Sequence, residues 1–208
     1  MNYQSDYWFY PKAFSNDFCD KIIDIAKKQK HNLAITGKEQ FALEKGKKIK
    51  TSDLKKRRNS NVVWLEDQFI YDEVYPFLHQ ANLEAKWNMD FDWSESCQFT
   101  KYSKGQFYDW HCDSFPVPYS KHKGDSWEGK IRKLSCTISL SEPKNYQGGL
   151  LEFDLRNSYS KSKKIKCKEI LPKGSICVFP SYTWHRVTPV TKGTRYSLVI
   201  WSLGKPFK

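Results

Sequence analysis

The sequence predicts a mainly β fold, a sandwich or jelly roll, with helices that buttress one sheet. From Glu95 onward, eight short runs rich in β-branched and aromatic residues follow one another over about 110 residues. Turns that contain glycine or proline separate these runs, and helical periodicity is confined to the residues before them. Strands that succeed one another without intervening helices pack as two sheets, which gives this fold class.

The first predicted element is a helix over residues 15–30. Ser15 or Asn16 offers an N-terminal cap, acidic residues follow it, and lysines gather at the far end. Apolar side chains recur every three to four residues and form one buried face: Phe18, Ile22, Ile25 and Ala26.

The rest of the N-terminal part alternates between basic and apolar segments. Residues 31–58 are polar and basic, and they predict a mobile loop or an irregular insertion. Residues 61–65 predict a short strand. Residues 67–82 predict a second helix, which Pro76 is expected to bend or interrupt because proline lacks a backbone N–H.

The C-terminal part supplies the strands of the predicted sheets. They are expected at residues 96–102, 106–112, 133–140, 149–155, 164–170, 175–180, 184–190 and 195–201. No internal repeat or linker interrupts the chain, so we expect one domain over residues 1–208. Residues 1–94 would form the buttress of helices and loops, and residues 95–203 the jelly-roll core.

The charge and the cysteine content of the chain indicate its kind of partner and its cellular compartment. Lysine and arginine number 35 against 23 acidic residues, a net charge of +12. This charge indicates an acidic partner, such as nucleic acid, an RNA-rich assembly or an acidic protein, or else only a lysine-rich solvated surface. The six cysteines form no C-x-x-C pair and are expected to be free thiols. With no apolar run of about 18 residues and no leader pattern, we expect a soluble cytoplasmic protein without membrane contact.

The segment YDWHCDS places His111 between Asp109 and Asp113. On a strand all three would share one face, because side chains alternate with period two. A second histidine, His185, follows several strands later. Two histidines and one carboxylate leave open positions on a metal, which is typical of iron(II) oxygenases rather than of closed zinc sites.

Ten residues beyond His185, Arg195 begins a predicted strand. Its side chain would share a face with Ser197, Val199 and Trp201. An interior arginine needs a partner, and its planar fork suits a carboxylate bidentately. The partner would be either a bound carboxylate or an acidic side chain such as Glu152.

Together these segments resemble the prolyl 4-hydroxylase-like group of Fe(II)- and 2-oxoglutarate-dependent dioxygenases, especially its bacterial and viral members. The likeness covers about residues 95–203 and, more weakly, RNSNVVWL and the helices before it. It implies a double-stranded β-helix (jelly roll) and a chemistry that uses Fe(II), 2-oxoglutarate and O2, with ascorbate as a supporting reductant. The segments that resemble the family are QFTKYSKGQFYDWHCDS, RKLSCTISLSEP, YQGGLLEF and PKGSICVFPSYTWHRVTPVTKGTRYSLVIW.

The resemblance implies a set of iron ligands. These are His111, Asp113 and His185. Asp109 would then form a hydrogen bond or an ion pair with a lysine or arginine, and Cys112 would be a packing residue on the opposite face.

The resemblance also implies a pocket for 2-oxoglutarate. Arg195 would anchor its distal carboxylate, Tyr102 would line the pocket, Trp201 would form an aromatic wall, and Ser197 would complete an R-x-S pair. The chain departs from the family at Ser139, where many prolyl hydroxylases have a second tyrosine. Ser139 would then reach the carboxylate through water, or a side chain of the neighbouring strand would replace it: Gln98 or Thr100.

The substrate remains open at the level of sequence. The resemblance favours a prolyl or other residue of a protein or peptide, with residues 47–60 and 114–130 as flanking lids and Trp127 and Tyr119 as contacts. A free amino acid or small metabolite is the alternative. Nucleic-acid demethylation is less favoured, because Trp201 stands where such enzymes usually have a second arginine. A non-catalytic jelly roll is less favoured as well, because no candidate ligand is missing. The oligomeric state is not predicted.

Overall fold

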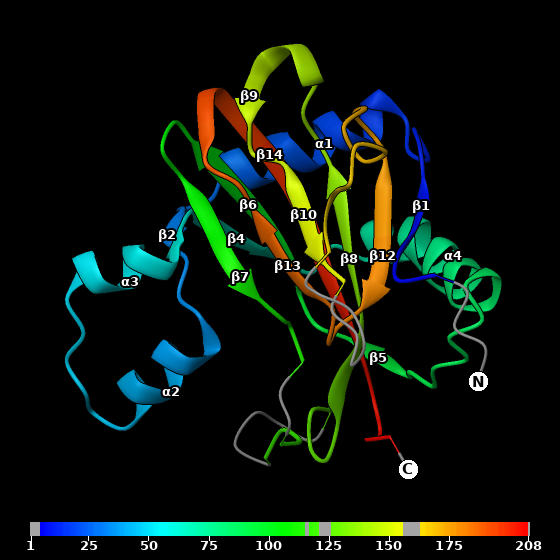
Figure 1. Ribbon diagram of the computed structural model, residues 1–208, viewed down its shortest axis with the longest axis horizontal. Helices are drawn as coiled ribbons and strands as arrows, with labels where there is room; N and C mark the ends of the chain where they lie inside the picture. The colour runs from blue at the N-terminus through cyan, green and yellow to red at the C-terminus, as the bar shows by residue number, and fades with distance from the viewer. Residues whose placement is uncertain (1–4, 115–116, 121–125, 156–162, 208) are drawn as a thin grey trace.

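The computed structural model describes residues 5–114, 117–120, 126–155 and 163–207. Its strands form two antiparallel sheets, and Figure 1 shows the smaller sheet in front of the larger. The larger sheet has the order β1 (Trp8–Tyr10), β12 (Ile176–Pro180), β8 (Ile131–Ser139), β14 (Val190–Gly204), β6 (Cys97–Ser103), β4 (Asn61–Leu65) and β2 (Asn32–Leu33), with β5 (Trp93–Ser94) and β9 (Tyr146–Gly148) paired to β14. The smaller sheet has the order β11 (Lys164–Lys166), β10 (Leu151–Asp154), β13 (Trp184–Val187), β7 (Phe107–His111) and β3 (Arg58–Asn59). The predicted jelly-roll fold class is confirmed.

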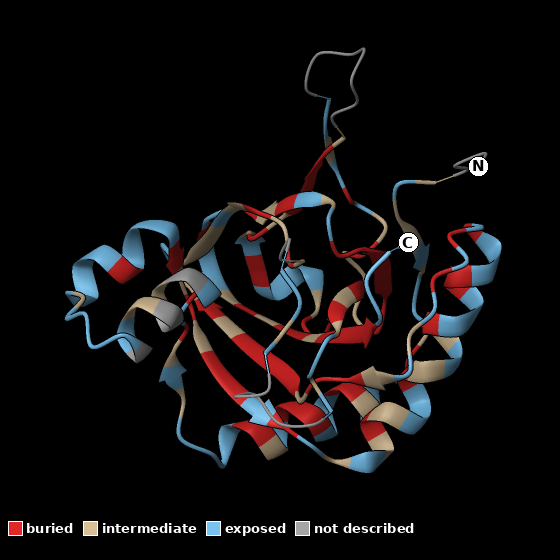
Figure 2. Cartoon of the chain, turned by 90° about the horizontal axis from the view of Figure 1, so that it is seen from below, coloured by how far each residue is buried: buried red, intermediate tan, exposed pale blue. Residues whose placement is uncertain are grey.

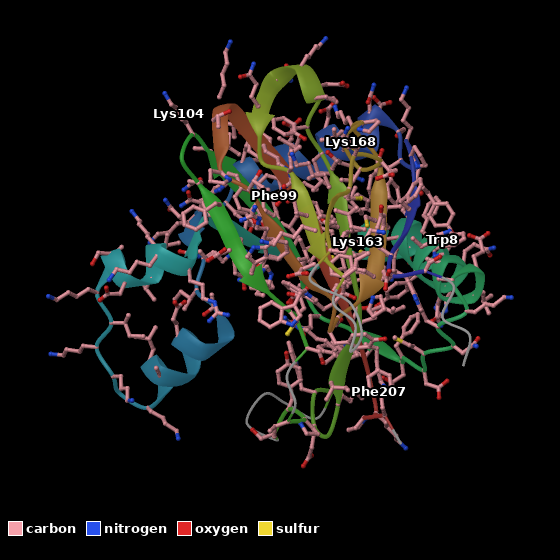
Figure 3. The ribbon with its side chains drawn as sticks, in the orientation of Figure 1. Trp8, Phe99, Lys104, Lys163, Lys168 and Phe207 are labelled. Carbon is pink, nitrogen blue, oxygen red and sulfur yellow. The ribbon has the colours of Figure 1, made fainter. Side chains whose placement is uncertain are left out.

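Two helices cover the outer face of the larger sheet, as predicted. They are α1 (Asn16–Lys27) and α4 (Gln68–Glu84), and Figure 1 shows both behind the sheet. The cap of α1 is Ser15, whose Oγ accepts a hydrogen bond of 3.1 Å from the N–H of Phe18. Buried residues of both helices join those of the sheet, such as Phe99, in one hydrophobic core. Figure 3 labels Phe99 in the middle of the molecule.

Helix α4 continues through Pro76, so the expected interruption is wrong. Its buried face, which includes Val74 and Leu78, packs on the sheet on both sides of the proline. Tertiary packing of this face offsets the hydrogen bond that Pro76 cannot donate.

None of the described helices is long and apolar enough to cross a membrane.

The expected loop at residues 31–58 is instead a small ordered lobe, which is a correction. It contains α2 (Gly37–Glu44) and α3 (Thr51–Arg57) between the short strands β2 and β3. At the start of helix α2, the backbone N–H and the Oγ1 of Thr36 both donate to Glu39 Oε2, at 2.9 Å and 2.8 Å. Helix α3 is held by Leu54, the buried residue of its otherwise exposed sequence. In Figure 2 the lobe extends to the left of the sheets and is largely exposed.

All six cysteines are free thiols, as predicted, and five of them are buried. Cys112 is half-buried, and its Sγ lies 3.8 Å from the carbonyl oxygen of Ser114. A short 3-10 helix, η2 (Pro143–Asn145), precedes β9 and completes the described elements.

Candidate functional site

Three buried side chains meet between the two sheets. His111 ends β7, Asp113 follows two residues later, and His185 lies on β13, opposite His111 in the strand pairing. The nitrogen and oxygen atoms that these side chains offer as ligands all lie within 4.8 Å of one another. The structure therefore brings together the three side chains that the sequence proposes as metal ligands.

The hydrogen bonds of both imidazoles fix the atoms that face the carboxylate. His111 Nδ1 lies 2.7 Å from the carbonyl oxygen of Asp109, and His185 Nδ1 lies 2.9 Å from that of Thr183. A carbonyl can only accept, so each Nδ1 has the proton and each Nε2 has a free lone pair. His111 Nε2 and His185 Nε2 each lie 3.6 Å from an oxygen of Asp113. The two nitrogen lone pairs and the negatively charged carboxylate repel one another unless a cation lies between them. This set of donor atoms therefore fits a divalent metal ion.

The electrostatics of the site favour the binding forms of His111 and Asp113. Burial, together with the neighbouring His185, holds the pKa of His111 well below its usual range, which favours the neutral imidazole. Burial opposes the ionisation of Asp113, but nearby positive charge, on His185 and His111 when they are protonated and on Arg132, outweighs it and lowers its pKa to about 2. Ser135 Oγ also donates to Asp113 Oδ2 at 2.8 Å, which orients the carboxylate.

A bulge in β7 separates the two aspartates. The pairing with β13 matches His185 to His111 and Val187 to Tyr108, so β7 has one residue more than its partner in this interval. The extra residue breaks the alternation and stacks the ring of Tyr108 on His111, with centroids 3.5 Å apart. The side chain of Asp109 is exposed, and its carboxylate has no hydrogen-bond or ion-pair partner within the described part of the chain. The shared face expected for Asp109 and its expected ion pair are therefore wrong, and Asp109 contributes its backbone carbonyl instead.

The predicted face of β14 lines the same cavity as the triad. Arg195, Ser197, Val199 and Trp201 all border it, together with Tyr102. Arg195 is 2% exposed, its Nη1 donates to Ser197 Oγ at 3.1 Å, and its guanidinium lies 5.6 Å from the ring centre of Tyr102.

Arg195 has no acidic partner among the residues that the structure describes. Glu152, the alternative partner, instead accepts a hydrogen bond of 2.7 Å from Arg186 Nε. Gly149 leaves room for the arginine, because an added Cβ there would lie 2.9 Å from Arg195 Cδ. A buried guanidinium without an acid is available for the carboxylate of a bound molecule.

The other predicted pocket residues divide into two groups. Gln98 borders the cavity and donates to Thr100 Oγ1 at 3.0 Å. Ser139 is buried but does not border the cavity; Thr137, two residues earlier on β8, does. Trp201 forms part of the cavity wall, and its indole N–H is close enough to the Asp113 carboxylate to help lower the pKa of that carboxyl.

Tyr119 and Trp127 lie outside the cavity lining. Their rings meet edge to face at 5.0 Å, and Trp127 also packs on Trp93 at 4.9 Å. Residues 115–116 and 121–125 of the proposed lid lie outside the described residues. A substrate contact of Tyr119 or Trp127 remains a prediction.

An ion pair supports the triad from outside. Arg132 Nε on β8 donates to Glu95 Oε1 at 2.6 Å. The guanidinium lies 3.9 Å from the ring centre of Trp201, and its Nη1 is 3.5 Å from the carbonyl oxygen of Asp113. This pair therefore contacts both a candidate metal ligand and the aromatic wall.

Sequence reasoning missed Arg58 as a site residue. It is 5% exposed and borders the cavity, and its guanidinium lies 4.5 Å from the ring centre of Tyr108. Its Nε donates to Ser60 Oγ at 3.1 Å, and it forms no ion pair within the described ranges. In the sequence Arg58 is one of several cationic residues in a basic run. Only the pairing of β3 with β7, which places Arg58 opposite Tyr108, distinguishes it from the other cations of that run.

Comparisons with known proteins agree with this geometry. The profile of the 2OG-Fe(II) oxygenase superfamily matches residues 97–203. A PKHD-type hydroxylase of Xanthomonas axonopodis pv. citri is 34% identical over 104 residues, which are 50% of this chain and 42% of the relative. This chain thus spans less than half the length of that relative.

Solved structures share the fold over almost the whole chain. The viral collagen prolyl hydroxylase of Paramecium Bursaria Chlorella virus-1, in its 2OG complex, has a TM-score of 0.63, 20% identity and 97% coverage of both chains. A prolyl hydroxylase of Trichoplax adhaerens, in complex with a hypoxia inducible factor oxygen degradation domain peptide fragment, has a TM-score of 0.62 and 13% identity, and covers 96% of this chain and 84% of that one. At such identities the likeness shows the fold.

Proposed function

This chain belongs to the 2OG-Fe(II) oxygenase superfamily, and we propose that it hydroxylates an unactivated C–H bond of a prolyl or other residue in a protein or peptide. The family uses Fe(II), 2-oxoglutarate and O2. One observation supports the proposal above the others: His111, Asp113 and His185 border the same cavity as Arg195, which has no acidic partner among the described residues.

The triad would hold the metal from one side. Its two Nε2 atoms and one carboxylate come from β7, β13 and the residues directly after β7, and all three side chains border the cavity. When bound, Fe(II) supplies the oxidation in which O2 converts 2-oxoglutarate to succinate and CO2 and one oxygen atom enters the substrate C–H bond. The protein needs no proton-transferring side chain for this chemistry.

The other side chains of the cavity would orient the co-substrate and exclude water. Arg195 offers a planar fork to the distal carboxylate of 2-oxoglutarate, and Ser197 holds that fork through its hydrogen bond. Tyr102 and Trp201 form walls of the pocket. Because these residues come from the larger sheet and the ligands from the smaller one, the co-substrate would bridge the two sheets.

The remaining donors of Arg58 support a substrate with carbonyl or carboxylate oxygens. In a peptide, backbone carbonyls next to the target residue would accept from its guanidinium, and the two similar structures are prolyl hydroxylases, one of them with a bound peptide. In a free amino acid, the α-carboxylate would take the same place. A small metabolite is therefore the second candidate substrate.

An activity screen that measures succinate separates these substrates. The protein is reconstituted with Fe(II) and 2-oxoglutarate and is given either peptides from a cell extract or a panel of free amino acids. We expect succinate release and peptides that are one oxygen atom heavier, and we expect neither with His111→Ala. Succinate release stimulated by a free amino acid and not by peptides would favour the second candidate. No turnover with either class would contradict the proposed function.

A further inference from the structure

The lobe between β2 and β3 has an unusual concentration of positive charge. Residues 45–57, here called the basic lobe, contain seven cationic residues and one acidic residue. Their net charge of +6 is half of the net charge of the chain, +12. The acid is Asp53, which pairs with Lys56 at 2.8 Å. Seven cationic residues of the lobe are exposed: Lys45, Lys47, Lys48, Lys50, Lys55, Lys56 and Arg57.

The basic lobe leads directly into the cavity. Arg58 directly follows α3 as its C-cap, and its backbone N–H donates to the carbonyl oxygen of Leu54, while its side chain borders the cavity beside Tyr108. A helix rises about 1.5 Å per residue, so Lys50 lies roughly 12 Å along α3 from Arg58. The exposed cations therefore follow the chain away from the site, from Arg57 directly before Arg58 to Lys50 at the other end of α3.

This concentration of positive charge is costly without an anion. Seven exposed cations within 13 residues repel one another, and the lobe buries little apolar surface in return, because Leu54 is the buried side chain of α3. A row of acidic side chains would relieve this repulsion. An extended polypeptide advances about 3.3 Å per residue, so roughly four residues span the distance from Arg58 to Lys50.

We propose that the basic lobe binds an acidic segment of the polypeptide substrate, about three to seven residues from the residue that enters the cavity. The inference rests on the proposed function and adds a substrate class to it. A polypeptide fits better than a nucleic acid, because the lobe adjoins Arg58 and the buried cavity of the candidate metal ligands, where a side chain is to be oxidised. An acidic flank would hold the target residue at the mouth of this cavity.

The test uses synthetic probes and charge-reversed variants. One labelled peptide has a central proline with four glutamates at positions four to seven on one side, and its matched peptide has glutamines there. A second pair places the same residues on the other side. The variant Lys48→Glu/Lys50→Glu/Lys55→Glu leaves the Lys56–Asp53 pair intact.

A matched control reverses three exposed lysines outside the lobe: Lys144, Lys168 and Lys192. Figure 3 labels Lys168 in the upper part of the molecule, away from α2 and α3. Binding is measured by fluorescence anisotropy at low salt and again at 200 mM salt, and a 12-nucleotide thymidine oligomer is the third probe.

We expect the wild-type protein to bind one glutamate peptide about tenfold more tightly than its glutamine match at low salt, and less so at 200 mM salt. The lobe variant should lose this preference, and the control variant should keep it. No preference in the wild-type protein, or equal loss in both variants, would overturn the proposal. Tighter binding of the oligonucleotide than of either glutamate peptide, lost in the lobe variant, would overturn it in favour of nucleic acid.

Failure of the proposed function would look different. Glutamate-dependent binding would then persist in a protein that releases no succinate from 2-oxoglutarate. The reverse result, succinate release without glutamate-dependent binding, would leave the oxygenase intact and would contradict the docking surface alone.

Discussion

At the scale of single residues, one inserted position in β7 decides which aspartate meets the metal site. Strand alternation alone places Asp109, His111 and Asp113 on one face. The bulge turns Asp109 to solvent and leaves its carbonyl to accept from His111 Nδ1 at 2.7 Å. The carboxylate of Asp113 is buried between two imidazoles instead.

The two aspartates should therefore respond differently to substitution. Asp113→Ala removes a ligand and should abolish metal binding and succinate release, because two histidines alone hold a divalent cation weakly. Asp109→Asn keeps the backbone carbonyl and should retain most of both. Metal binding is measured by calorimetry without oxygen. Loss of binding in Asp109→Asn with retention in Asp113→Ala would reverse the ligand assignment.

The residues of the site were predictable wherever the strands are regular. On β14, Arg195, Ser197 and Trp201 border the cavity as alternation predicts. The exposed position of Asp109 was not predictable, because a bulge is defined by the register of two strands far apart in the sequence. Arg58 was missed for a related reason, since only its pairing with Tyr108 on β7 sets it apart from the other cations around it.

At the scale of elements, local capping and tertiary pairing account for the differences from the predicted fold. The ordered α2 has a sequence signature, Thr36 followed three residues later by Glu39, which the basic composition around it obscured. The strands β2 and β3 have two residues each and no signature of their own. They exist through pairing with β4 and β7, which alternation within one segment does not reveal.

The ion pair that joins Glu95 to β8 makes a prediction at this scale. Glu95→Gln removes the carboxylate that the mostly buried guanidinium of Arg132 contacts, so we expect the free energy of unfolding to fall by about 3–5 kcal/mol. Asp92→Asn is the matched control, because it removes the nearby Lys130–Asp92 pair, whose carboxylate is 61% exposed. The expected loss for this control is under about 1 kcal/mol. Urea denaturation measures both losses, and equal values would show that burial of the Arg132–Glu95 pair adds nothing to its strength.

At the scale of the whole molecule, the two sheets share the site between them. The candidate metal ligands come from β7, β13 and the residues directly after β7, on the side of the smaller sheet, while Arg195, Ser197 and Trp201 belong to the larger sheet. A molecule that binds both the metal and Arg195 would link the sheets across the cavity. The contribution of this molecule to stability should then depend on the metal, because its link to the smaller sheet would be made through that ion.

Thermal unfolding tests this coupling between the sheets. Mn(II) favours the same kinds of ligand atoms as Fe(II) and should raise the midpoint of unfolding alone, and 2-oxoglutarate should raise it further only when Mn(II) is present. At about 100 times its Kd, a ligand adds about 2.7 kcal/mol, or roughly 5–10 °C for a chain of this size. Arg195→Gln should keep the increment from Mn(II) and lose the one from 2-oxoglutarate, whereas His185→Ala should lose both. Each increment is compared within one variant, so a change in basal stability does not affect the result. An increment from 2-oxoglutarate that is equally large without Mn(II) would contradict the bridge, because it would show that Arg195 and its own sheet bind the molecule without the metal side of the cavity.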